Sequence, residues 1–261
     1  MKTNIKKSLI FKTLPAAMTL WLVFSSGTTY AADTLTIAAA SNLTYVMPSL
    51  VEAFEASNKD LKVRASLSST GNLYSQIRNG APFDLFLAAD EERPKRLFAE
   101  GFTEGEPFTY AIGGLVLWSR EKLNVVEGLY LLSSPEIKRI ALANPDHAPY
   151  GAATREALID AGLWSVLKDK FIYGENVGQA AQFVQSGAAQ AGFMAESLLK
   201  NPAMEGGSFY RLPAGSHTPL VQRGVVLKRK GRFNSAALRF RDFLFSPAAK
   251  KILKAYGYGV D

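Results

Sequence analysis

Apolar runs alternate with helical spacings between residues 35 and 98, and this order limits the fold of the chain more than any other feature. Three segments predict strands: 35–40, 62–67 and 83–88. The first of them is a run of small and branched apolar side chains, which is typical of a buried parallel strand. A helical spacing of apolar residues follows each of them, at 43–54, 73–77 and 94–98. Pro48 predicts a kink or a late start in the first helix. This order predicts a parallel sheet with right-handed crossovers.

The second half of the chain repeats the pattern less regularly. Strands are expected at 115–118, 139–143, 191–194 and 221–227, and helices at 154–161, 179–186, 236–245 and 248–256. Extended segments at 110–114 and 221–224 are the candidate crossings between the halves. A chain that crosses twice forms two lobes with a cleft, and ligands bind at the carboxyl ends of strands in such sheets. We expect a first lobe from residues 32–112 and 223–261 and a second lobe from residues 113–222.

The first 31 residues predict a secretory signal peptide. Four lysines precede an apolar run from Leu14 to Phe24, and no acidic residue precedes Asp33. A membrane anchor would need roughly 20 apolar residues, and this run is shorter. We expect cleavage after Ala31 and export to the periplasm. The chain has no cysteine, which suits an oxidising compartment and excludes disulfides, thiolate metal sites and cysteine nucleophiles.

The charge balance gives no support for nucleic-acid binding. The formal net charge is +7, but four of the positive charges are lysines of the expected signal peptide. The remaining sequence has no arginine-rich block, and its aromatic residues are not interleaved with basic ones as a nucleic-acid platform requires. We therefore interpret the remaining charge as an ordinary solvated surface.

Four short turns, at 40–43, 68–72, 148–151 and 175–178, carry most of the functional information. Each follows a strand pattern, or the loop after one, and leads into a helical pattern, and none contains lysine or arginine. The first N–H groups of a helix have no partner within it and carry partial positive charge, so they favour an anion. For any single turn, ordinary capping is the better explanation, because Ser, Thr and Asn are the preferred N-cap residues. Two such turns in each half predict an anion held between two lobes by neutral donors.

Neutral donors suit a fully deprotonated tetrahedral oxyanion. Such an anion needs hydrogen-bond donors only, whereas a phosphate site usually needs an acceptor for the remaining proton. Sulfate, molybdate and tungstate meet this description. Asp90, Asp146 and Glu175 flank the turns. We expect these carboxylates at the rim of the site, because an unpaired carboxylate facing a dianion would be costly.

No motif in the sequence points to catalysis. His147 and His217 are the only histidines, and neither has a metal-ligand spacing. The nucleophile elbow of hydrolases, a Ser-x-x-Lys motif and a phosphate-binding glycine loop are all missing from the sequence. A secreted hydrolase of anionic esters, with Ser41 or Ser69 as nucleophile, remains an alternative, although no base is placed to activate either serine. We expect a non-enzymatic protein with no cofactor and no side chain that ligates a metal ion.

Six motifs in this order and spacing resemble the periplasmic molybdate-binding proteins that supply ABC transporters. They are Ala38-Ala39-Ala40-Ser41-Asn42-Leu43, Ser69-Thr70-Gly71-Asn72-Leu73 with Gln76-Ile77, Gly80 to Phe86, Asn144-Pro145 to Pro149-Tyr150-Gly151, Glu175-Asn176-Val177 to Ala180, and Ala248-Ala249 to Tyr256-Gly257. The resemblance covers essentially the whole chain after the expected signal peptide. It implies the type II periplasmic-binding-protein fold, an α/β fold of two lobes, each a largely parallel sheet flanked by helices, that closes on molybdate or tungstate.

The resemblance also implies the anion ligands of the first lobe. Ser41 would donate through its hydroxyl and main chain, and Asn42 through its main chain. Ser69 or Thr70 would match the second hydroxyl position. The Ser-Ser-Gly usual in the family is Ser68-Ser69-Thr70-Gly71 here, so both hydroxyls stay open as candidates.

In the second lobe, the resemblance implies donors from Tyr150 and from the main chain of Val177. Some members of the family use a tyrosine after the strand at 191–194, where this chain has Ala195, so either one donor is missing or Tyr150 replaces it. The implied partner is an ABC transporter permease in the membrane, and we expect a monomer. A receptor for sulfate or another tetrahedral oxyanion remains the alternative within the same class.

Overall fold

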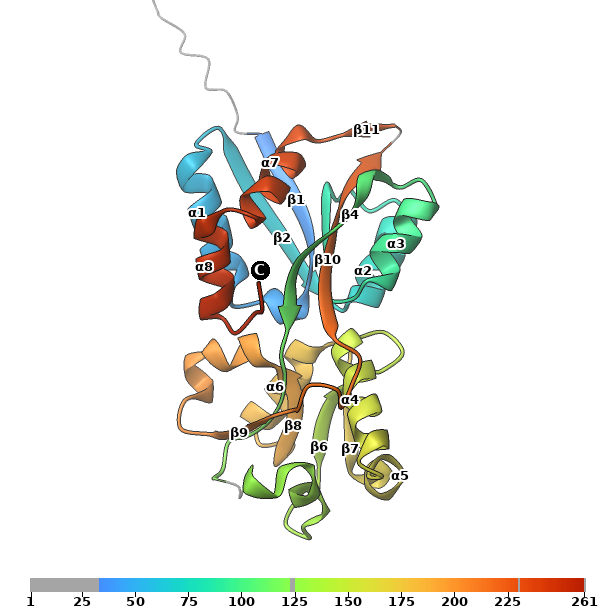
Figure 1. Cartoon of the computed structure of the whole chain (residues 1–261), viewed down its shortest axis with the longest axis vertical. Coiled ribbons are helices and arrows are strands. Elements are labelled where there is room, and N and C mark those ends of the chain that lie inside the picture. The colour runs from blue at the N-terminus through green and yellow to red at the C-terminus, as the bar shows by residue number, and fades with distance from the viewer. Residues whose placement is uncertain (1–32, 123–124, 230, 261) are drawn as a thin grey trace, which may run out of the picture. The chain divides into compact units, whose positions relative to one another are not determined.

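The computed structural model describes residues 33–122, 125–229 and 231–260 of the 261-residue chain (Figure 1). The expected signal peptide, residues 1–31, lies outside the described residues. None of the helices in the described part of the chain is both long enough and apolar enough to cross a membrane. The described residues form two β-sheets with their helices, which we call lobe 1 and lobe 2.

Lobe 1 is built on a six-stranded sheet with the order β11-β10-β3-β1-β2, in which β4 also pairs with β10. The strands are β1 (Asp33–Ala40), β2 (Leu61–Ser68), β3 (Leu85–Ala88), β4 (Thr103–Gly113), β10 (Leu220–Arg229) and β11 (Arg232–Phe233). β1 pairs in parallel with β2 and β3, as the sequence predicts, whereas β10 pairs antiparallel with β3, β4 and β11. The antiparallel strands make this sheet more mixed than the largely parallel sheet that we expected.

Helices cover both faces of the lobe 1 sheet. Leu35 and Ile37 of β1 belong to a core with α1 (Met47–Ser57), α7 (Ser235–Leu244) and α8 (Pro247–Ala255). Ala38, on the other face of β1, belongs to a core with α2 (Thr70–Arg78) and α3 (Glu92–Ala99). β1 is therefore buried on both sides, which explains its continuous apolar pattern. Pro48 lies in the first turn of α1, so the late helix start is confirmed.

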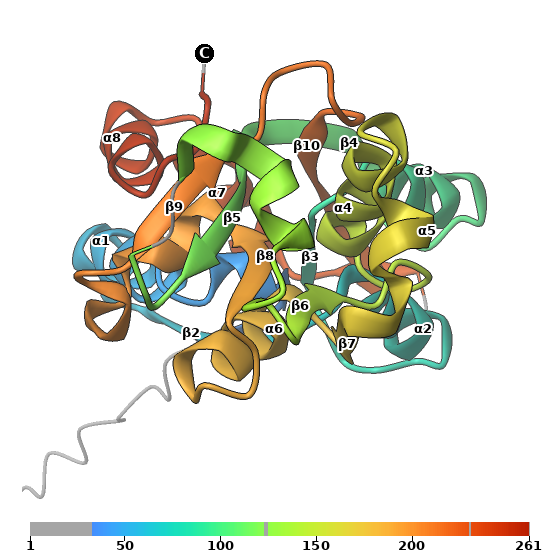
Figure 2. The same ribbon diagram turned by 90° about the horizontal axis from the view of Figure 1, so that it is seen from below.

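Lobe 2 is built on a five-stranded sheet with the order β7-β6-β8-β5-β9. Its strands are β5 (Leu115–Ser119), β6 (Ile140–Ala143), β7 (Phe171–Gly174), β8 (Ala191–Ala195) and β9 (Ser208–Arg211). β6 is parallel to β7 and β8, and β5 is antiparallel to β8 and β9. Figure 2 shows α4 (Pro149–Asp160) and α6 (Val177–Gln185) on opposite faces of this sheet.

Shorter helical segments complete the two lobes. They are η1 (Ser41–Leu43) in lobe 1 and, in lobe 2, η2 (Val125–Ser133), α5 (Trp164–Leu167), η3 (Lys168–Lys170), η4 (Glu196–Lys200) and η5 (Pro202–Met204). Of these, η1 and η4 contribute to the region between the lobes, because the Ser197 hydroxyl of η4 donates to the Asn42 carbonyl of η1 at 2.7 Å.

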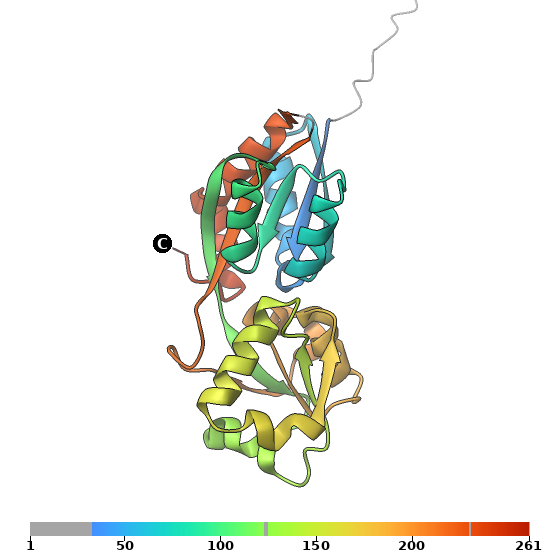
Figure 3. The same ribbon diagram turned by 90° about the vertical axis from the view of Figure 1, so that its right-hand side faces the viewer.

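Two connections join the lobes, and both lie beside the paired strands β4 and β10 (Figures 1 and 3). The first passes from β4 to β5 at Gly114, and the second runs through residues 212–219 between β9 and β10. The expected boundary between residues 222 and 223 therefore falls inside β10, and the second crossing lies earlier in the chain. The reason is that residues 220–222 already pair with the end of β4.

Candidate functional site

The carboxyl ends of the parallel strands in both lobes meet at one small cavity. Its volume is about 10 Å³, which is room for one small group. The residues that line it are Ala40, Ser41, Asn42, Ser69, Thr70, Ala89, Ala148, Pro149, Tyr150 and Val177. All six residues proposed from the sequence are therefore brought together, four from lobe 1 and two from lobe 2. Among the described residues, no charged side chain lines this cavity.

In lobe 1, two hydroxyls are held with their protons available. Ser69 is the N-cap of α2, and its oxygen accepts from the Asn72 N–H at 3.3 Å. The Thr70 oxygen accepts from the Ala89 N–H at 3.1 Å. A hydroxyl has one proton and two acceptor positions, so each of these groups can still donate into the cavity. Both side chains are buried, and both hydroxyls are candidates to donate to a ligand.

The turn after β1 places a third hydroxyl at the cavity. Ser41 and Asn42 open the segment η1, and both are buried. The Ser41 carbonyl accepts from the Thr44 N–H at 3.2 Å and from the Thr44 hydroxyl at 2.6 Å. These two hydrogen bonds close the turn and do not use the N–H groups of Ser41 and Asn42. The Asn42 side-chain amide donates to Gln222 at 2.9 Å, a contact that the sequence analysis missed. Gln222 lies in an apolar strand and is fully buried, and a polar residue in such a run is the signal that could have revealed it.

In lobe 2, the starts of two helices face the cavity. α4 has Pro149 in its first turn, and because proline has no N–H, Tyr150 provides the first N–H of this helix. Gly151 is needed there, since a Cβ would overlap the Ala143 carbonyl at the end of β6. α6 begins at Val177 after the N-cap Asn176, whose side chain accepts from the Gln179 N–H at 3.0 Å. The Val177 N–H therefore stands at a helix start, where no partner within the helix exists.

The Tyr150 hydroxyl lies at the connection between the lobes. A Cβ built on Gly113 would collide with it, so the hydroxyl packs against the last residue of β4. Burial is the main cause that raises the pKa of Tyr150 well above its usual range, and the nearby Asn42 amide opposes part of that rise. In the described residues, the Tyr150 hydroxyl and the Asn42 carbonyl oxygen Oδ1 are the buried side-chain atoms without a hydrogen-bond partner. Ala195, at the end of β8, is buried and brings no donor.

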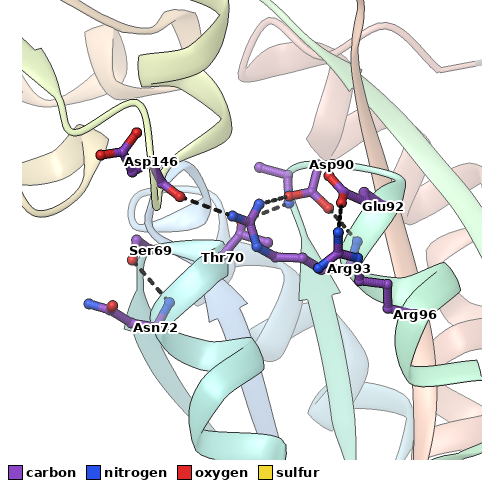
Figure 4. A network of polar contacts seen from close by, with 9 residues as sticks. Ser69, Thr70, Asn72, Asp90, Glu92, Arg93, Arg96 and Asp146 are labelled. Atoms are coloured by element: carbon purple, nitrogen blue, oxygen red, sulfur yellow. Dashed lines mark hydrogen bonds and ion pairs between the residues drawn. The ribbon is translucent and has the colours of Figure 1, made fainter. Parts of the chain in front are cut away.

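A network of polar contacts lies beside the turn that contains Ser69 and Thr70 (Figure 4). Asp90 forms an ion pair with Arg93, and Arg93 also reaches the Asp146 carbonyl of lobe 2 at 3.5 Å. The Gly71 N–H at the start of α2 donates to the His147 carbonyl of lobe 2 at 2.9 Å. Neither Asp90, Asp146 nor Glu175 lines the cavity. These contacts connect lobe 1 to lobe 2 directly, so the lobes are closed over the cavity.

A larger cavity of about 1110 Å³ lies at the other end of the lobe 1 sheet. Thr34 and Thr36 at the start of β1 and Lys228 near the end of β10 line it together with apolar residues. The described residues that line this larger cavity all belong to lobe 1. In the described part of the chain, no group of three or more His, Cys, Asp or Glu residues is placed to hold a metal ion. The small cavity between the lobes is therefore the best candidate for the functional site.

Comparisons with known proteins place most of the chain in one family. The family described as bacterial extracellular solute-binding protein matches residues 35–259. The molybdate-binding protein ModA of Azotobacter vinelandii is 42% identical over 226 residues, which cover 86% of this chain and 89% of that protein. ModA of Rhodobacter capsulatus is 39% identical over 197 residues, which cover 75% and 77%. The solved structure of the periplasmic molybdate-binding protein of Azotobacter vinelandii superposes with a TM-score of 0.80 at 35% identity, covering 87% of this chain and 99% of that one.

Proposed function

The chain belongs to the bacterial extracellular solute-binding proteins, and we propose that it captures molybdate or tungstate and delivers it to an ABC importer. Solute-binding proteins of such importers work with a membrane permease and bind a small ligand. The observation that carries the proposal is the cavity between the lobes, lined by hydroxyls and helix starts and by no charged side chain. The relatives named as molybdate-binding proteins, at 42% and 39% identity, support molybdate as the ligand.

The proposed mechanism is closure of the two lobes on the anion. Ser41, Asn42 and the hydroxyls of Ser69 or Thr70 would donate from lobe 1, and the N–H groups of Tyr150 and Val177 from lobe 2. An anion that contacts both lobes binds the closed form better than the open form, so it shifts the population towards closure. The cavity is small enough that the anion gives up its water shell and relies on these donors.

We propose the periplasm as the site of action, because the solved relative of Azotobacter vinelandii is named as a periplasmic protein and the N-terminal sequence predicts a signal peptide. Solute-binding proteins are generally not enzymes, and we propose the same for this chain. Neither histidine is among the residues that line the cavity, so a hydrolytic role for Ser41 or Ser69 lacks a base there. A single copy supplies every residue of the proposed site, which is consistent with a working monomer.

A thermal-shift and calorimetry series tests the proposal. Residues 32–261 form a compact unit of their own and are the protein to use. Molybdate, tungstate, sulfate and phosphate are added at increasing concentration. Ligand at about 1,000 times its dissociation constant adds roughly 4 kcal/mol, which raises the midpoint by on the order of 10 °C.

The outcomes separate the alternatives. A shift with molybdate and tungstate alone is the expected result. A shift with sulfate at equal concentration would instead indicate a receptor for other tetrahedral oxyanions. Hydrolysis of a chromogenic ester that disappears in Ser41→Ala would indicate an enzyme, and no shift with any anion would refute the proposal.

A further inference from the structure

Tyr258 stands close to the end of the chain but reaches the middle of the molecule. The segment after α8 pairs with the end of β4, where Ile112 and Gly259 exchange two main-chain hydrogen bonds of 2.8 Å each. This pairing lies two residues before Gly114, where the chain crosses into lobe 2. Tyr258 is only 4% exposed, so its ring is fixed beside that crossing.

The Tyr258 hydroxyl contacts both lobes. It accepts from the Asn42 side-chain amide at 2.8 Å and lies 3.0 Å from the Asn42 carbonyl and 3.2 Å from the Ser197 hydroxyl. Ser197, from lobe 2, donates to the same Asn42 carbonyl at 2.7 Å. We call the Tyr258 hydroxyl, the Ser197 hydroxyl and the main-chain carbonyl of Asn42 together the Asn42 bridge.

The Tyr258 and Ser197 hydroxyls hold the turn of Ser41 and Asn42 without lining the cavity themselves. Asn42 lines the cavity, whereas Tyr258 and Ser197 do not. The two amide protons of Asn42 are used by Tyr258 and by Gln222, and Gln222 is itself held by donating to the Leu220 carbonyl at 2.8 Å. These hydrogen bonds, made by groups that do not line the cavity, therefore fix the orientation of the Asn42 side chain and of its peptide group.

The bridge is also complete only when the lobes are closed, because Ser197 belongs to lobe 2 while Asn42 and Tyr258 belong to lobe 1. Opening the lobes would leave the Asn42 carbonyl with one donor fewer and would expose the Ser197 hydroxyl to water. A buried hydrogen bond that forms only on closure favours the closed state.

We propose that Tyr258 is a positioning residue of the anion site, which holds Asn42 in place and couples anion retention to lobe closure through Ser197. This inference rests on the proposed function for the identity of the anion. It predicts that the Tyr258 hydroxyl affects the dissociation rate of the anion, although it does not touch the anion.

The test compares Tyr258→Phe with Tyr256→Phe. Tyr256 lies in the same segment, and its hydroxyl is 3.2 Å from that of Ser49, so its contact stays within lobe 1. We expect the Kd for molybdate to rise about tenfold in Tyr258→Phe, mostly through faster dissociation, and to change less than about twofold in Tyr256→Phe. Ser197→Ala should give a similar rise, and combining it with Tyr258→Phe should give less than the product of the two effects.

A structural role alone would give a different result. Tyr258→Phe would then lower the melting temperature of the anion-free protein and leave the Kd and the dissociation rate equal to those of Tyr256→Phe, which would refute the proposal. Additive effects of Tyr258→Phe and Ser197→Ala would refute the coupling between them.

A second readout keeps the inference separate from the proposed function. The chain has no cysteine, so dyes can be attached to Lys59→Cys in lobe 1 and Lys138→Cys in lobe 2, both at exposed positions. If the wild-type protein binds none of the oxyanions, the proposed function fails, but Tyr258→Phe should still reduce the closed fraction measured by energy transfer relative to Tyr256→Phe. Equal closed fractions would refute the positioning role.

Discussion

Replacing Gly71 with alanine should oppose lobe closure while leaving the open protein intact. Gly71 lies in the first turn of α2, and its N–H donates to the His147 carbonyl of lobe 2 at 2.9 Å. A Cβ at this position would lie 2.8 Å from that carbonyl oxygen and 3.1 Å from the His147 Cα. Both atoms belong to the backbone of the other lobe, so neither can move aside as a flexible side chain would.

Within lobe 1 the added Cβ would lie 3.3 Å from the Arg93 side-chain nitrogen Nη2, the end of a flexible side chain, so the costly clash is the one with lobe 2 and its cost appears in binding. Overpacking of this kind costs about 1–3 kcal/mol, so the Kd for molybdate should rise by roughly 5- to 150-fold in Gly71→Ala. Within α2, alanine is a better helix former than glycine by up to about 1 kcal/mol. The anion-free protein should consequently melt at an equal or slightly higher temperature. Affinity and anion-free stability thus move in opposite directions.

Calorimetric titration with molybdate and melting of the anion-free protein measure the two effects. Ser75→Ala is the matched control, because it raises helix propensity at a solvent-exposed position of the same helix. An unchanged Kd in Gly71→Ala would mean that the bound form does not bring α2 against His147. A large loss of anion-free stability would mean that the clash persists without closure, and either result would refute the reasoning.

Three further predictions concern the cavity and its surroundings. Ser41→Ala should weaken molybdate binding by about 1–3 kcal/mol because it removes a buried donor, whereas Val177→Ala should matter less because its donor is main-chain; titration calorimetry measures both. Tyr150→Phe should leave affinity within a few-fold and anion-free stability equal or higher, since the hydroxyl it removes has no partner; a large affinity loss would assign that hydroxyl to the anion. Burial raises the pKa values of Tyr110, Tyr150 and Tyr258 in the folded state. Their contribution to the free energy of unfolding is therefore complete below the unfolded pKa of about 10 and is lost as the pH rises above it. Urea unfolding from about pH 8 to about pH 11 should show this fall in stability, and a flat profile would contradict it.

The first half of the fold could be predicted because its signals are local. β1, β2 and β3 carry apolar patterns that each stand beside a helical spacing, and Pro48 marks the helix start. β4 was predicted only near its end, because its exposed and buried residues do not alternate regularly and its partner β10 follows more than 100 residues later. The order of the antiparallel strands depends on that distant pairing.

The candidate site also divides into residues that local sequence patterns predict and residues that only distant contacts bring together. Ser41 and Ser69 could be selected from the turn chemistry alone, and the structure brings both to the cavity. The role of the Asn42 side chain could not, because Gln222 and Tyr258 lie 180 and 216 residues away in the sequence. Nor does a sequence tell that the Tyr150 hydroxyl packs against Gly113, since only the meeting of the two lobes decides where that hydroxyl lies.

The pairing of β4 with β10 has a mechanical consequence. Both connections to lobe 2 leave from neighbouring, hydrogen-bonded strands, so a bend across this strand pair is the motion that would separate the lobes. The register of this pair is irregular at Gln222–Arg223 and at Gly224–Val226, a few residues after the second connection. Under the proposed function, a membrane permease that binds both lobes and separates them would release the anion without contacting it.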